Sequence, residues 1–183
     1  AAGLSIVDPR ERSDEKRAQA DQAHRLFREQ NSDFLSYLNL WDTYQQQWRE
    51  LKTQNKMRKF CKRHFLSFPR MREWHDIHHQ IDKICQNMKG YTENKKSAQY
   101  EAVHKSLLTG LLMNTAIKKE RGMYTATRGR EIMIFPGSAL FKKEQQWIFC
   151  HEIVETTRVY ARTGAAMKDG GIEQLAPGMC RST

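Results

Sequence analysis

The histidines His75, His78 and His79 have the spacing in this sequence that most directly suggests a metal site. Residues three and four positions apart share one face of a helix, as pairs of zinc ligands do. No nearby cysteine or second histidine pair completes a set of ligands. We therefore interpret the three histidines as part of a packed, basic helix, and we predict no metal.

A second motif with a possible zinc ligand begins at His151 and reads HEIVE. In zinc proteases a second histidine follows the first after one helical turn, with a glutamate base between them. Glu155 stands at the position of that second histidine, and the surrounding residues are typical of a strand. A zinc-protease site is therefore excluded.

The motifs of nucleotide hydrolysis are absent from the sequence. It contains neither a GxxxxGK[ST] loop nor a strand ending in Asp-Glu-Ala-His, and it also lacks the GxSxG turn of hydrolases. Without the backbone cradle and its lysine, nothing holds the phosphates of ATP and magnesium. We predict that this chain contains no catalytic site and holds no cofactor.

The charge balance favours a polyanionic partner. The sequence has 31 Lys and Arg against 21 Asp and Glu, a formal net charge of +10. Such an excess favours binding to a polyanion through the release of counterions, so nucleic acid or ribosomes are the expected partners. The alternative is a solvated basic surface that only keeps the protein in solution.

One basic run covers residues 56–72, which include seven Lys or Arg and no carboxylate. Phe60, Phe65 and Phe68 lie among these cations. A basic face with aromatic residues is able to follow a phosphate backbone and stack bases. The alternative places the aromatic rings in the core and the charges in solvent, and both interpretations stay open for the lysines and arginines.

A second basic region covers residues 121–143. Arg121, Arg128 and Arg130 flank Tyr124, and Lys142 and Lys143 follow later. Glycines at 129 and 137 allow the backbone to bend and approach a ligand closely. A small β-barrel with cations and backbone amides in its loops is a common platform for single-stranded nucleic acid. The alternative is an ordinary turn with charges that face solvent.

The remaining composition indicates a folded protein without a membrane span. Hydrophobic residues make up 39% of the chain, and no stretch of about 18 apolar residues occurs. The N-terminus lacks the features of a signal peptide and looks like a cut inside a longer protein. The cysteines form no CxxC pair, which indicates a reduced, cytoplasmic setting; they are Cys61, Cys85, Cys150 and Cys180.

The apolar spacing predicts helices in the first part of the chain and strands in the second. Helical patterns begin near residues 18, 32, 55, 69 and 98, with Ser32, Asn55 and Ser67 as caps and Gly90 at the end of the fourth helix. Short strands are predicted at 124–127, 131–135, 147–154 and 158–167. The predicted fold class is α+β, with an extended lead-in at 1–17, a helical bundle at 18–112 and a small β-barrel at 113–183.

Several segments, in order along nearly the whole chain, resemble the helicase-associated region of HrpA-type DEAH-box ATP-dependent RNA helicases. These segments are 8–12 (DPRER), 34–41 (FLSYLNLW), 58–61 (RKFC), 65–68 (FLSF), 70–78 (RMREWHDIH), 107–112 (LLTGLL), 134–143 (IFPGSALFKK) and 152–158 (EIVETTR). The sequence departs from the family pattern at three places. Glu144 and Gln145 replace a usual Pro-Pro, Pro69 replaces an apolar residue, and 168–173 lacks a tryptophan that would anchor the last strand.

The resemblance implies a ratchet-like helical domain and an OB-fold that follow a winged-helix region and two RecA-like motor domains of the same chain. It further implies that the module binds and positions single-stranded RNA while the motor, which binds ATP and Mg, pulls a 3′ strand through. We expect RNA contacts from Tyr124, Arg128, Arg130, Gly137, Ser138, Lys142 and Lys143, with Tyr124 stacking a base and the cations neutralising phosphates. The alternative function is a protein-interaction module that docks an acidic activator or a ribosomal partner.

Overall fold

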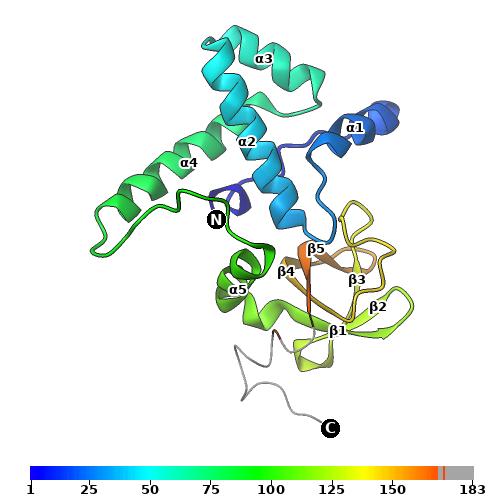
Figure 1. The fold of residues 1–183 in the computed structure, drawn as a ribbon. Coiled ribbons are helices and arrows are strands. Elements are labelled where there is room, and N and C mark those ends of the chain that lie inside the picture. Colours follow the sequence, from blue (N-terminus) through cyan, green and yellow to red (C-terminus); the bar gives the residue numbers. More distant parts are fainter. Residues whose placement is uncertain (169–170, 172–183) are drawn as a thin grey trace. The chain divides into compact units, whose positions relative to one another are not determined.

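The computed structural model describes residues 1–168 and 171, and their contacts form two compact units (Figure 1). The helical unit contains residues 1–28 and 37–95, and the barrel unit contains residues 29–36 and those from 96 onward. The sequence predicted a boundary between the two parts at residue 112. The observed grouping differs, because the helix that begins at Tyr100 and the short segment 29–36 both pack with the strands. None of the helices in the described part of the chain combines the length and the hydrophobicity that a membrane span requires.

The helical unit is built from four helices, in agreement with the predicted pattern. They are α1 (Arg17–His24), α2 (Asp33–Leu51, in this unit from residue 37), α3 (Gln54–Arg63) and α4 (Phe68–Gln86). The predicted cap at Asn55 is wrong, since the Thr53 hydroxyl accepts from the Lys56 amide at 3.4 Å. The helix predicted to end at Gly90 ends at Gln86.

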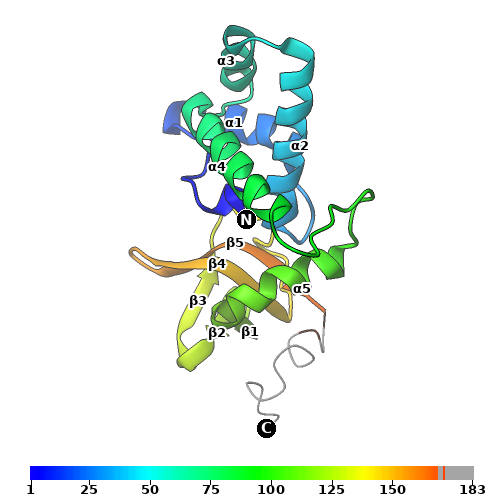
Figure 2. The same cartoon turned by 90° about the vertical axis from the view of Figure 1, so that its left-hand side faces the viewer.

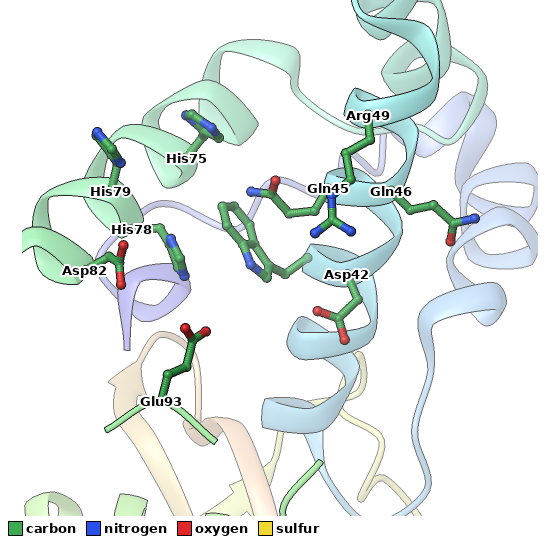
Figure 3. Close-up of a pocket in the computed structure, with 10 residues that line it drawn as sticks. Asp42, Gln45, Gln46, Arg49, His75, His78, His79, Asp82 and Glu93 are labelled. Atoms are coloured by element: carbon green, nitrogen blue, oxygen red, sulfur yellow. The ribbon is translucent and has the colours of Figure 1, made fainter. Parts of the chain in front are cut away.

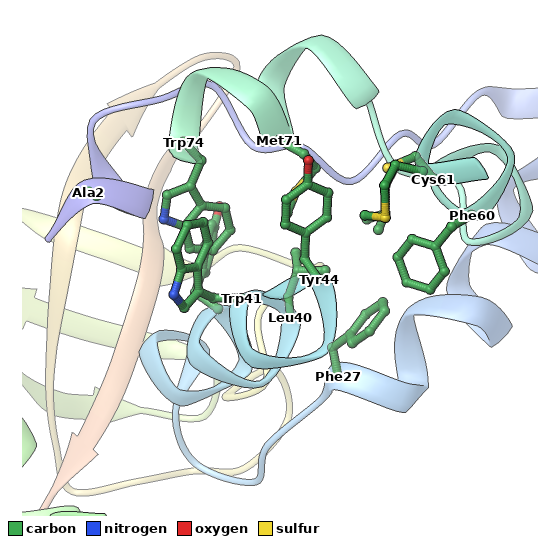
Figure 4. Packing of buried hydrophobic residues seen from close by; sticks show 12 residues of the cluster. Ala2, Phe27, Leu40, Trp41, Tyr44, Phe60, Cys61, Met71 and Trp74 are labelled. Carbon is green, nitrogen blue, oxygen red and sulfur yellow. The ribbon is translucent and has the colours of Figure 1, made fainter. Parts of the chain in front are cut away.

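Aromatic rings from α2 and α4 form the centre of the helical core (Figure 4). Trp41 and Trp74 stack with ring centroids 5.1 Å apart, and Tyr44, Met57 and Met71 are fully buried beside them. Gly3 lies directly on Trp74, where an added Cβ would be 2.5 Å from the indole. The absence of a side chain at Gly3 therefore allows the N-terminus to cover the tryptophan.

The N-terminal lead-in is fixed along the turn between α3 and α4. The Ser67 amide donates to the Pro9 carbonyl at 2.7 Å, and the Glu11 amide donates to the Phe65 carbonyl at 2.8 Å. The guanidinium of Arg70 donates to the Asp8 carbonyl at 2.9 Å. This segment is extended, as predicted, between short 3-10 helices at Ala2–Leu4 and Asp14–Lys16.

The barrel unit contains five strands whose pairing closes on itself in the order β1-β2-β3-β5-β4. The strands are β1 (Thr115–Glu120), β2 (Met123–Ala126), β3 (Glu131–Ile134), β4 (Trp147–Glu155) and β5 (Val159–Met167). All pairs are antiparallel except β3 with β5. The order confirms an α+β protein with a small barrel.

The helix α5 (Tyr100–Leu111) packs against β4 of the same unit (Figure 2). Its His104 and Leu108 are fully buried. The barrel core consists of inward-facing residues from all five strands and the β3–β4 connection: Ala116, Tyr124, Ala126, Ile132, Ile134, Leu140, Ile148, Cys150, Ala161 and Ala166. Most of the segment 168–173 and Cys180 lie outside the described residues.

Candidate nucleic-acid interface

Ser138 is an internal hydrogen-bond donor in the barrel unit. Its hydroxyl donates to Asp33 Oδ2 at 2.5 Å, and only 5% of the residue is exposed. The amides of Ala139 and Gly164 donate to the same carboxylate at 2.7 and 2.9 Å. We expected Ser138 to offer RNA its backbone amide or its hydroxyl, but both groups donate within the protein, the hydroxyl to Asp33 and the amide to the Phe135 carbonyl at 2.9 Å.

Asn31, like Asp33, accepts hydrogen bonds from the β3–β4 connection. Its carbonyl accepts from the Ala166 amide at 2.9 Å, which joins it to β5. Its side-chain oxygen accepts from Gln145 at 3.2 Å and from the Lys143 ammonium at 3.5 Å. The half-buried Lys143 is thus directed partly toward the protein, and the segment 29–36 holds the loop in one conformation.

Lys142 lies on the outside of this braced loop. It is exposed, has a left-handed backbone (φ 64), and its ammonium is 5.5 Å from the ring centroid of Phe141. Phe141 is 36% exposed. The loop therefore offers a cation beside an aromatic ring, and sequence reasoning identified the cation but not the ring. Gly137 lies in the turn before them and is half-buried.

Tyr124 does not have the base-stacking position predicted for it. It is 1% exposed, and it belongs to the barrel core. Its neighbours along β2 alternate between partial and full burial, and Tyr124 is on the inward side. Burial raises the pKa of its hydroxyl to about 12. A ring enclosed in this way is unable to stack on a ligand, so the prediction is wrong.

The β2–β3 turn presents two of the predicted cations. Arg128 and Arg130 are exposed, and Arg128 and Gly129 both have left-handed backbones, with φ of 63 and 73. Arg130 forms an ion pair with Glu155 at 2.7 Å. Exposed pairs of this kind contribute only about 0–1 kcal/mol, so a phosphate is able to replace the carboxylate at little cost.

An aromatic and cationic cluster on the outside of β3 and β5 was not among the predicted site residues. The Arg162 guanidinium lies 4.6 Å from the centroid of the Phe135 ring, and Phe135 meets Tyr160 edge to face at 6.0 Å. Ile134 and Ala161, which alternate with these residues, face the core. All three members are half-buried. The alternation of Tyr160 and Arg162 with Val159 and Ala161 was a visible signal for an outward face.

The three histidines of the sequence analysis line a pocket of about 620 Å³ between α2 and α4 (Figure 3). His78 packs on Trp41 at 4.6 Å between ring centroids, and burial lowers the pKa of its imidazole. Asp42, Asp82 and Arg49 line the same pocket. Within the described residues, no group of three or more His, Cys, Asp or Glu is arranged to hold a metal ion.

Comparison with known proteins finds one matching family and several similar RNA helicases. Residues 103–179 match the oligonucleotide/oligosaccharide-binding (OB)-fold family. Over 96% of its length the chain is 41% identical to the ATP-dependent RNA helicase HrpA homolog of Haemophilus influenzae, and over 100% it is 37% identical to HrpA of Escherichia coli. A human protein described as a probable ATP-dependent RNA helicase (DHX35) is 26% identical over 95% of the chain. The chain spans 13% and 14% of the length of the two bacterial proteins.

Proposed function

We propose that this chain binds and positions single-stranded RNA. The proposal is supported by its similarity, over its whole length, to one segment of HrpA-type RNA helicases and by the OB-fold family match of its second part. In this proposal it is an accessory module of an ATP-dependent 3′–5′ helicase. RecA-like motor domains of the same polypeptide bind ATP and Mg, and the module presents the strand to them.

The observation that carries the proposal is the Phe135–Tyr160–Arg162 cluster on the outer face of the barrel. Every base has a flat face, so stacking on aromatic rings and guanidinium planes is available to any sequence. A duplex keeps its bases stacked inside, which makes them inaccessible to such a cluster. The cluster therefore favours single strands.

The phosphate contacts would come from cations before and after β3. Arg128 and Arg130 immediately precede β3, and Lys142 lies in the connection that follows it. These residues carry positive charge in exposed positions, where they are able to neutralise phosphates without reading the sequence. The internal bonds of Asn31 and Asp33 hold the loop of Lys142 in place before RNA arrives, which lowers the entropic cost of binding.

The test is a titration of a fluorescent single-stranded RNA with the variant Tyr160→Leu, which removes the ring but keeps an apolar side chain. We expect about a 5- to 100-fold loss of affinity, the range found when a stacked aromatic is truncated. Tyr91→Leu, at a 45% exposed tyrosine of the helical unit, is the matched control and should bind normally. Equal affinities for Tyr160→Leu and the unmodified protein would contradict the stacking role.

A further inference from the structure

The outer surface of α3 carries positive charge only. Lys56, Arg58, Lys59, Lys62 and Arg63 are all exposed, and Lys52 just before the helix is exposed as well. No acidic residue occurs between Glu50 and Glu73. Among the described residues, none of these six cations forms an ion pair. The helix is therefore a dense cluster of unneutralised charge.

The other side of α3 is fixed in the helical core, so the cationic side has one orientation within its unit. Met57 is buried, and so are Phe60 and Cys61, which Figure 4 shows in the helical core. The guanidinium of Arg58 lies 5.2 Å from the centroid of the Phe68 ring. These contacts hold the helix in place. Of the two interpretations of the aromatic residues in the run 56–72, the core position is the correct one for Phe60.

The arrangement of these charges is unfavourable for the protein alone. Lys56 and Lys59 are three positions apart, and Arg58 and Lys62 are four apart, so like charges are neighbours on the helix surface. Lys56 lies in the first turn, where the helix dipole disfavours a cation, although Lys62 and Arg63 in the last turn are favoured by it. A bound polyanion would relieve this repulsion.

We propose that the outer face of α3 is a second nucleic-acid site that binds the phosphate backbone and reads neither the bases nor the sugar. A helix of ten residues is about 15 Å long, which matches about four phosphates of one strand at 3.4 Å per phosphate along a duplex axis. Lysine and arginine side chains contact these phosphates in any sequence. This site belongs to the helical unit, and the proposal does not depend on the barrel face.

The exposed residues of this surface favour a nucleic acid over an acidic protein. Protein interfaces have a core enriched in aromatic and apolar residues and depleted in lysine. From Lys52 to Arg63, the exposed positions hold only cations, Thr53, Gln54 and Asn55. A surface with many cations and no exposed apolar residue has the composition of a phosphate-binding face.

The test compares two variants with the same change of charge. The test variant is K56Q/R58Q/K59Q/K62Q on α3. The control variant is K83Q/K89Q/K95Q/K96Q, which changes one exposed lysine in the last turn of α4 and three exposed lysines that follow this helix. Glutamine is a good helix former, so α3 should persist, and circular dichroism verifies this. The slope of log affinity against log salt is measured with single-stranded RNA, single-stranded DNA and duplex RNA of equal length.

We expect the α3 variant to reduce the slope by about 0.7 for each lost phosphate contact on single strands, thus by 2 to 3 in total. The reduction should also appear with single-stranded DNA and duplex RNA, and the control variant should change the slope by less than half as much. Equal changes in the two variants would assign the effect to net charge and overturn the site. An unchanged slope in the α3 variant would also overturn it and leave an acidic protein as the candidate partner.

A footprint on the unmodified protein gives an answer even if the variant does not fold. A short single-stranded RNA should protect Lys56, Lys59 and Lys62 from acetylation and leave Lys83 and Lys89 reactive. Full reactivity of the three α3 lysines at saturating RNA would contradict the proposal. The two proposals fail independently, because Tyr160→Leu tests base stacking through the affinity for single-stranded RNA, while the α3 variant tests phosphate contacts through the salt slope of every nucleic acid.

Discussion

Asp33 and Ser138 are joined by a 2.5 Å hydrogen bond although they are 105 positions apart in the sequence. Asp33 begins α2, and Ser138 lies in the connection between β3 and β4. The bond, with those from Ala139 and Gly164, makes the first turn of α2 a structural part of the barrel unit. The conformation of the β3–β4 loop thus depends on Asp33 at the start of α2, about a hundred positions earlier in the sequence.

The first prediction concerns this carboxylate. Asp33→Ala removes the acceptor of three buried hydrogen bonds and leaves their donors without it, which should lower the free energy of unfolding by about 3 kcal/mol or more. Asp42→Ala, at an exposed aspartate on the same helix, should change it by less than about 0.5 kcal/mol. Urea unfolding of both variants measures the difference, and equal stabilities would show that the Asp33 network is dispensable.

The second prediction concerns pH and the buried His104. Its Nδ1 donates to the Tyr100 carbonyl at 2.6 Å and its Nε2 accepts from the Ser32 hydroxyl at 2.6 Å, an arrangement that fits the neutral ring. Desolvation by burial lowers the pKa of His104 in the folded protein. The unfolded chain therefore binds a proton more readily, and the stability due to the neutral ring is lost as the pH falls below about 6.5.

The measurement is the free energy of unfolding between pH 7.5 and 5.5 for the wild type and for His104→Gln. As the pH falls, His104 should lower the free energy of unfolding of the wild type by up to about 1.4 kcal/mol per pH unit. The free energy of unfolding of the variant should depend less steeply on pH. The variant is expected to be less stable at pH 7.5. Parallel curves for the two proteins would show that another group carries the dependence.

The third prediction uses two glycines with different surroundings. Gly3→Ala places a Cβ 2.5 Å from the Trp74 ring, so the N-terminal segment or the indole must move, at a cost of about 1–3 kcal/mol. Gly110→Ala in α5 meets nothing within 4 Å and should stabilise its helix by about 0.5–1 kcal/mol. Thermal unfolding followed by tryptophan fluorescence distinguishes them, and a neutral Gly3→Ala would contradict close packing on Trp74.

The fourth prediction tests the cations before and after β3. The charge reversal R128E/K142E should weaken single-stranded RNA binding by at least about tenfold and reduce the salt dependence, because two phosphate contacts become repulsive. The matched control is R17E/R25E, at exposed arginines of the helical unit. A loss of affinity that is equal in both variants would show that only net charge matters.

Much of the fold was predictable because its elements have strong local patterns. The helices α2 and α4 have apolar stripes, and the cap at Ser32 is confirmed by its hydroxyl, which accepts from the Leu35 amide at 3.1 Å. The strand β1 was missed, since Lys118, Lys119 and Glu120 fill its second half and hide the alternation. Its pairing with β2 and β4, which a local pattern does not reveal, makes it a strand.

The candidate site was only partly predictable, because exposure depends on packing between distant segments. Arg128, Arg130 and Lys142 are exposed, and their contact with phosphates stays a prediction. Tyr124 is in the core and Ser138 is bonded to Asp33, and neither fact follows from the residues next to them. Conversely, Phe135 and Arg162 are far apart in sequence and meet only because β3 and β5 pair in parallel.

The most direct test of RNA positioning by the barrel is the affinity of the K56Q/R58Q/K59Q/K62Q variant, which keeps the barrel and lacks the proposed α3 site, for a single-stranded RNA and for a duplex of the same length. Both affinities are measured at two salt concentrations, because the phosphate contribution changes with salt and the stacking contribution does so much less. Our account predicts tighter binding of the single strand, with a preference that persists at the higher salt. Equal binding of the two RNAs at both concentrations, or a preference for the duplex, would contradict it.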